Sequence, residues 1–133
     1  MKRFLGILLC SLVVLGCERS TGLKNAHIQH QLTAMLADLS APGAGGNTVR
    51  KAMADLDALT TVESATLSRQ QCDLLLEVRQ ELKIAHESWD AYKIHAGQNL
   101  DPVEDRKANE SMQSLYAALA KAKQSLSDAA ATF

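Results

Sequence analysis

Two long segments in the second half of the chain carry apolar side chains at alternating spacings of three and four residues. This is the heptad spacing of α-helices that pack side by side. Only a short stretch around Gly97 separates the segments, so the two helices are expected to form an antiparallel hairpin. The first stripe is Leu75, Val78, Leu82, Ala85, Trp89, Tyr92 and Ala96, and the second is Ala108, Met112, Leu115, Leu119, Ala122, Leu126 and Ala129.

Start and stop signals predict where the hairpin helices meet. Asp101 suits an N-cap, Pro102 the first helical position and Glu104 the third, so a helix is predicted over residues 102–130. Gly97 is expected to end the preceding helix, as a glycine at C′ does.

The start of the preceding helix is less sharply marked. Thr60 and Glu63 have the spacing of a capping box, which predicts a helix over residues 62–96. Ser68 is an alternative start, which would leave a break near residues 65–66.

Two shorter helices are predicted ahead of the hairpin, over residues 23–40 and 48–59. The Pro/Gly cluster at residues 41–46 separates them, and Asn47 is the expected cap of the second. Their apolar stripes are Ile28, Leu32, Met35, Leu36 and Leu39, followed by Val49, Met53, Leu56 and Leu59. The prediction is an all-α, four-helix bundle-like domain over residues 23–133, with the two shorter helices covering the open face of the hairpin.

The residues ahead of this domain have the pattern of a secretory leader. Lys2 and Arg3 are followed by an apolar run from Phe4 to Leu15, which is too short to cross a bilayer core that needs about 20 residues. Residues 1–16 are therefore predicted to be a cleaved signal peptide.

The leader ends in Val14-Leu15-Gly16-Cys17, which resembles the lipobox of bacterial lipoproteins. The resemblance implies a diacylglyceryl thioether on Cys17, cleavage before it and acylation of the freed amine. Residues 17–22 would then be the lipidated cysteine and a short tether to the membrane. An ordinary signal peptide ending near a cysteine is the alternative. In enteric bacteria an aspartate directly after the lipidated cysteine resembles a signal for retention in the inner membrane. This chain has Glu18 at that position, which favours the outer membrane.

Charge and cysteine usage restrict the possible partners. Without the leader the chain has 12 basic and 15 acidic side chains, a formal charge of −3, and no basic run, so nucleic-acid binding is not expected. Cys10 lies in the leader, which leaves Cys72 as the one cysteine beyond Cys17 and excludes an intramolecular disulfide in the domain. Cys72 is expected to be buried, with pairing between chains as the alternative.

The histidines are candidate metal ligands, although no metal site is predicted. His27 and His30 are one helical turn apart, but two ligands make an incomplete site. His86 has Asp90 four residues later, and His95 follows; a surface hydrogen bond is the expected role of this pair. A solvated polar face is the expected role of His27 and His30.

Neither a cofactor nor catalysis is predicted. The chain has no Cys-x-x-Cys-His motif for covalent haem, and the methionines that could ligate another haem, Met35, Met53 and Met112, fit apolar stripes equally well. No glycine-rich nucleophile turn is present. The expected protein is not an enzyme.

Trp89 and Tyr92 lie in a segment, Leu82–Lys93, that faintly resembles a Trp-containing helix of lysozyme-inhibitor-like lipoproteins. Those proteins carry a cysteine shortly after the Trp, where this chain has His95, so no functional residue is transferred. Both aromatics are expected in the core, and either becomes the candidate partner contact if exposed.

The resulting hypothesis is a non-enzymatic, membrane-anchored envelope lipoprotein that binds or scaffolds another envelope protein. The alternatives are a bundle that binds a small molecule, metal or haem, and a structural lipoprotein that self-associates as a homo-oligomer.

Overall fold

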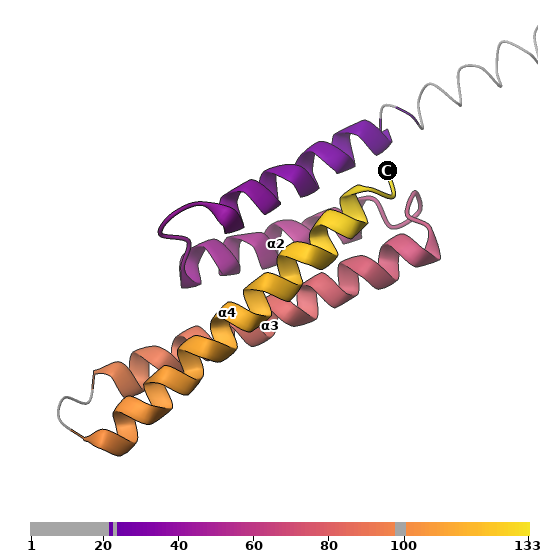
Figure 1. Ribbon diagram of the computed structural model, residues 1–133. Coiled ribbons are helices and arrows are strands. Elements are labelled where there is room, and N and C mark those ends of the chain that lie inside the picture. Colours follow the sequence, from indigo (N-terminus) through magenta and orange to yellow (C-terminus); the bar gives the residue numbers. More distant parts are fainter. Residues whose placement is uncertain (1–21, 23, 98–100) are drawn as a thin grey trace, which may run out of the picture.

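The computed structural model describes residue 22, residues 24–97 and residues 101–133. Regular structure in these residues is entirely helical: a first helix over residues 24–40, α2 (Gly46–Val62), α3 (Arg69–Ala96) and α4 (Pro102–Ala130) (Figure 1). The predicted all-α, four-helix bundle-like fold is confirmed. The predicted leader, the lipobox and Cys17 lie outside the described residues.

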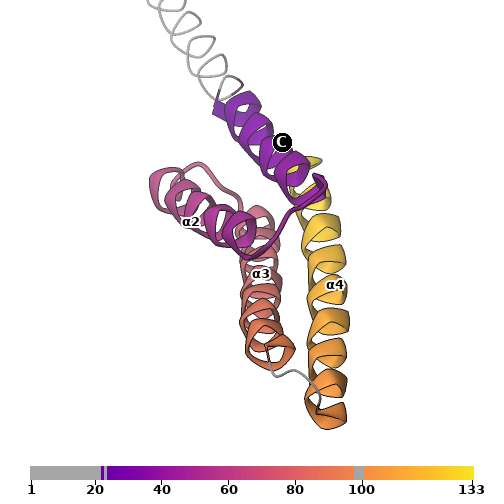
Figure 2. The ribbon, with the colours of Figure 1, turned by 90° about the vertical axis from the view of Figure 1, so that its left-hand side faces the viewer.

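The predicted antiparallel hairpin is formed by α3 and α4, which lie side by side along their length (Figures 1 and 2). Their heptad stripes face each other, and most members are buried because each stripe covers the other. Trp89, Tyr92 and Met112 are only partly buried, so the core position expected for the two aromatics is reached only in part. The buried stripe residues are Leu75, Val78, Leu82, Ala85, Ala108, Leu115, Leu119, Ala122, Leu126 and Ala129.

The two shorter helices cover only part of the hairpin. The first helix and α2 pack near the end where α3 begins and α4 finishes, and the opposite end of the hairpin projects beyond them (Figures 1 and 2). The expectation that they cover the whole open face is wrong because α2 has 17 residues, against 28 in α3 and 29 in α4. We call the projecting part, Trp89–Ala96 with Pro102–Ser114, the two-helix tip, and the remainder the four-helix half.

The loop at residues 41–45 breaks the chain as predicted, with Gly43 at a positive φ of 81°. The cap assigned to Asn47 is wrong: α2 begins one residue earlier, and Gly45 is its N-cap, without a side-chain hydrogen bond. The indole of Trp89 lies against Gly46 so closely that a Cβ there would be 2.2 Å from Trp89 Cδ1. Gly46 thus provides the space in which the tryptophan ring packs.

The predicted helix over residues 62–96 is also wrong at its start. α2 continues to Val62, and Thr60 lies inside it, where its hydroxyl donates to the carbonyls of Leu56 and Asp57 at 3.0 and 3.1 Å. The alternative start is correct, because Ser68 caps α3 in a capping box with Gln71.

The opposite junction follows the prediction more closely. Asp101 Oδ1 accepts a hydrogen bond from the Val103 amide at 2.9 Å, and Pro102 is the first residue of α4. α3 ends at Ala96 as expected, but Gly97 has a right-handed backbone with φ −77°, without the left-handed turn of a C′ glycine.

The burial predicted for Cys72 is wrong, because its side chain is exposed in the first turns of α3. The stripe position one turn before Leu75 is occupied by Gln71, whose amide donates to the Thr132 carbonyl at 3.2 Å. Cys72 therefore lies on the flank of the stripe, facing solvent.

Candidate functional site

The two aromatic candidates lie where the two-helix tip joins the four-helix half. Trp89 is partly buried against the core, and its ring centroid is 5.8 Å from that of Tyr92, which is half-buried. The indole packs against Gly46 and therefore lies between α3 and the start of α2. Trp89 therefore acts mainly as a structural anchor, and Tyr92 lies beside it.

The four histidines are distributed over different surfaces. His27 and His30 are exposed on the first helix. His86 lies between Asp90 Oδ2 and Arg50 Nη2, each 3.5 Å from a ring nitrogen, so this pair makes the surface contact that the spacing suggests. Lys93 and, more weakly, His86 and Arg50 lower the pKa of Asp90. The described residues contain no group of three or more His, Cys, Asp or Glu arranged to hold a metal.

His95 contributes to a second polar contact, at the tip. Its Nδ1 is 2.5 Å from Glu104 Oε2, and Lys107 Nζ is 3.3 Å from Glu104 Oε1. Hydrogen bonding to His95, and then to Lys107, lowers the pKa of Glu104. The glutamate thereby ties the end of α3 to the start of α4.

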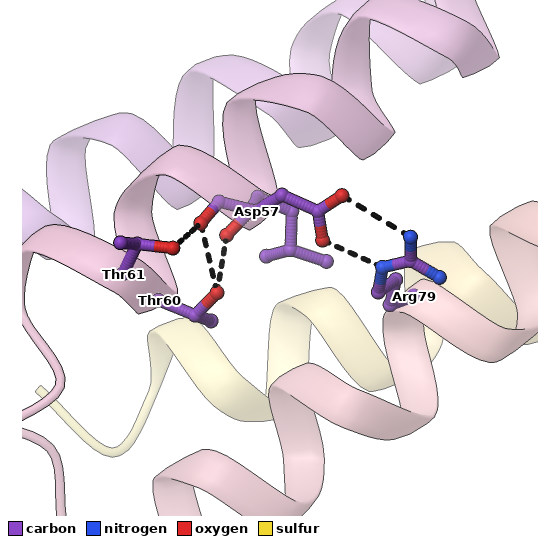
Figure 3. Close-up of polar contacts among 5 residues, drawn as sticks. Asp57, Thr60, Thr61 and Arg79 are labelled. Carbon is purple, nitrogen blue, oxygen red and sulfur yellow. Dashed lines mark hydrogen bonds and ion pairs between the residues drawn. The ribbon is translucent and has the colours of Figure 1, made fainter.

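A bidentate ion pair joins α2 to α3 in the four-helix half. Arg79 donates to both carboxylate oxygens of Asp57, at 2.6 and 3.1 Å (Figure 3), and this hydrogen bonding lowers the pKa of Asp57. The hydroxyl of Thr61 donates to the Asp57 carbonyl at 2.8 Å in the same turn. Sequence reasoning missed this pair, since its residues lie on different helices with no motif relating them.

The first helix and α2 enclose an open groove of about 400 Å³, which we call the N-terminal groove. It was not predicted, because it depends on how the two helices pair. The lining residues are His27, Gln31, Ala34, Met35, Asp38, Lys51, Asp55, Ala58, Leu59, Val62 and Glu63.

A second, smaller groove of about 270 Å³ lies between α2 and α3. Leu56, Leu67 and Leu75 supply apolar walls, and Cys72 and Leu76 line it as well. Leu76 is 64% exposed. An exposed thiol and an exposed leucine thus lie one helical turn apart at an apolar depression.

Comparison of the chain with known protein families, curated proteins and solved structures gave no significant match. None of the helices in the described residues is both long and apolar enough to traverse a bilayer. Functional assignment therefore depends on the sequence patterns and the surfaces described above.

Proposed function

We propose that the chain is a lipid-anchored envelope lipoprotein whose helical domain binds another envelope protein and catalyses no reaction. The observation that carries this proposal is the leader, in which a basic start, a short apolar run and Val14-Leu15-Gly16-Cys17 occur in order. Lipid on Cys17 would hold the domain at the membrane, with the outer membrane favoured by Glu18.

The tether supports a position close to the membrane surface. Five residues, Glu18 to Gly22, separate the proposed lipidation site from the start of the helix predicted from residue 23, and such a segment spans at most about 17 Å. The end of the bundle where the first helix begins would therefore lie nearest the lipid headgroups. A partner of this domain would meet it at or near the membrane surface.

Open surfaces support a binding role for the domain. Val62, Leu76, Ile94 and Tyr116 each expose more than 60% of their surface, and two grooves lie between adjacent helices. Exposed apolar side chains next to helix-lined grooves are typical of surfaces that receive a partner helix.

Replacement of the proposed lipidation site tests the anchor. In cells producing the Cys17→Ser variant, the chain should either keep its uncleaved leader or, where it is cut at another site, leave the membrane fraction. The Cys72→Ser variant is the matched control and should fractionate like the unaltered chain. If the Cys17→Ser variant still fractionates with membranes at the normal processed size, the anchor proposal is wrong.

Crosslinking in intact cells tests the binding role. A specific envelope protein should be recovered with the chain after stringent washing, and repeated recovery of the chain alone would contradict the proposal. The experiment is informative with the unaltered chain and with the Cys17→Ser variant, because binding and anchoring are separate properties.

Self-association is the second candidate function, favoured by the exposure of Cys72 beside Leu76. In an oxidising compartment two such thiols can pair between chains. Sedimentation should then show a dimer that reductant or the Cys72→Ser variant converts to a monomer, and a monomer under all conditions would exclude this function.

A further inference from the structure

We infer that the N-terminal groove is the docking site for a basic amphipathic helix of the partner protein. The inference rests on the proposed binding function and specifies both the surface and the chemistry of its occupant. Three features of the groove support it: a trough with an apolar floor, an excess of carboxylates and a buried acceptor without a partner.

The trough results from small side chains at the seam between two helices. Ala34 on the first helix and Ala58 on α2 are exposed and line the groove. Met35 and Leu59 are buried beside them and supply an apolar floor. At one end Val62 is 77% exposed. Small residues allow close approach of a third helix, so an apolar stripe can enter this trough.

The charges on the groove favour a cationic occupant. Asp38, Asp55 and Glu63 line the groove together with one lysine, Lys51. Lys51 is 3.5 Å from both Asp38 and Asp55, so it is shared between two carboxylates. Among the described residues no lysine or arginine pairs with Glu63. With His27 neutral, the lining has a formal charge of −2.

This charge also distinguishes a protein helix from a lipid surface. Anionic headgroups would be repelled by the carboxylates, although the groove lies on the helix that begins next to the proposed anchor. A helix with Lys or Arg beside an apolar stripe can pack its stripe on the apolar floor and pair its charges with the carboxylates of the groove.

Gln31 provides an independent indication of a ligand. It lines the groove, and its side-chain Oε1 is buried without a hydrogen-bond partner in the described structure. A buried acceptor without a donor costs free energy, and most such groups in native proteins are paired. If the Gln31 side chain turns toward the groove, an ammonium or guanidinium group of the docked helix would donate to this oxygen and remove that cost.

Two synthetic amphipathic peptides test the inference, one with leucine and lysine and the other with glutamate in place of every lysine. Each carries fluorescein, and its anisotropy is followed as the processed full-length chain is added. The chain is held in phosphatidylcholine vesicles, with vesicles lacking protein as the blank. If the chain carries no lipid, the titration is done in buffer, so failure of the anchor does not decide the outcome.

The lysine peptide is expected to bind at least about tenfold more tightly than the glutamate peptide. Ala58→Arg fills the trough and adds positive charge, and should weaken binding by about tenfold or more, whereas Ala120→Arg on the exposed face of α4 should not. Glu63→Lys should weaken the same complex through charge alone, without altering the apolar floor.

Gln31→Leu separates docking from general charge attraction. The substitution removes the unpaired acceptor, so it should weaken binding of the lysine peptide. The variant should be at least as resistant to unfolding by urea as the parent chain. Equal binding of the two peptides, no binding of either, or equal effects of Ala58→Arg and Ala120→Arg would overturn the inference.

Discussion

In the four-helix half, large aliphatic side chains from every helix meet in one core, whereas the two-helix tip has no such core. Ile28, Leu56, Leu82 and Leu126, one from each helix, are at most 1% exposed. In the tip, by contrast, Ala108 is the one buried residue among those described. A pair of helices can cover only the stripes that face each other, so the flanks of the tip remain in water.

Polar contacts partly take the place of a core in the tip. Ser88 and Ser114 hydrogen-bond at 3.1 Å where it begins, and Glu104 contacts His95 and Lys107 near its end. Such part-buried polar contacts stabilise less than fully buried aliphatic groups do. The tip is therefore expected to open locally at a lower free energy than the four-helix half.

The largest expected effect comes from the core. Leu75→Ala should lower the free energy of unfolding by about 2–5 kcal/mol, because it leaves a cavity at a fully buried site. Leu76→Ala, one residue later and 64% exposed, should change it by less than about 0.5 kcal/mol. Urea denaturation followed by circular dichroism measures both, and similar losses would contradict the assigned core.

A glycine at the boundary between the two regions should respond next most strongly. Gly46→Ala would place a Cβ 2.2 Å from Trp89 Cδ1, so overpacking should cost about 1–3 kcal/mol. Alanine is otherwise the better helix former, by about 1 kcal/mol. A gain in stability would therefore show that Trp89 does not occupy this space.

The same substitution at Gly97, directly after the α3 part of the tip, should change stability in the opposite direction. Gly97 has φ −77°, and an added Cβ would meet its nearest atom, the Lys93 carbonyl oxygen, at an ordinary 3.6 Å. Gly97→Ala should therefore stabilise the chain by about 0.4–1 kcal/mol, by restricting the unfolded state. Thermal denaturation of the Gly46→Ala and Gly97→Ala variants in parallel tests this difference in sign. A Gly97→Ala variant less stable than the parent would contradict it.

The smallest effect concerns the polar contact of the tip. The pKa of Glu104 lies below its ordinary value of 4.5, so its ionised form is stabilised by folding. This contribution is present above the ordinary pKa and is lost as pH falls through the lower pKa of the folded chain. Glu104→Gln should thus be less stable than the parent at about pH 6, with a smaller difference at about pH 3.

Urea titrations at the two pH values measure this difference. Glu110→Gln, an exposed position on the same helix, is the matched control. A Glu104→Gln variant as stable as the parent at both pH values would show that the contact with His95 contributes nothing.

The hairpin was predictable because its signals are local and agree with one another. Residues 102–130 were predicted as a helix from Asp101, Pro102 and a heptad stripe, and the structure has the same bounds. The start of α3 was misplaced because Thr60 and Glu63 match a capping box as well as Ser68 and Gln71 do. Tertiary contacts, and not local sequence, decide between two such matches.

The surfaces could not be predicted, for a related physical reason. The exposure of Cys72 and the N-terminal groove both depend on which neighbour covers which flank of a helix. An apolar stripe indicates the centre of the buried face of a helix but does not locate the edges of that face. The length of α2 determines how much of the α3–α4 hairpin is covered. The unpaired Gln31 becomes visible only when the first helix and α2 are placed together.

The central claim is that the chain functions as a lipid-anchored binding domain, and the intact mass of the processed protein tests its anchor most directly. The account predicts a chain beginning at Cys17, heavier than its amino-acid sequence by a diacylglyceryl group and an acyl group. A chain whose mass is that of the unmodified polypeptide, beginning at any residue, would contradict it.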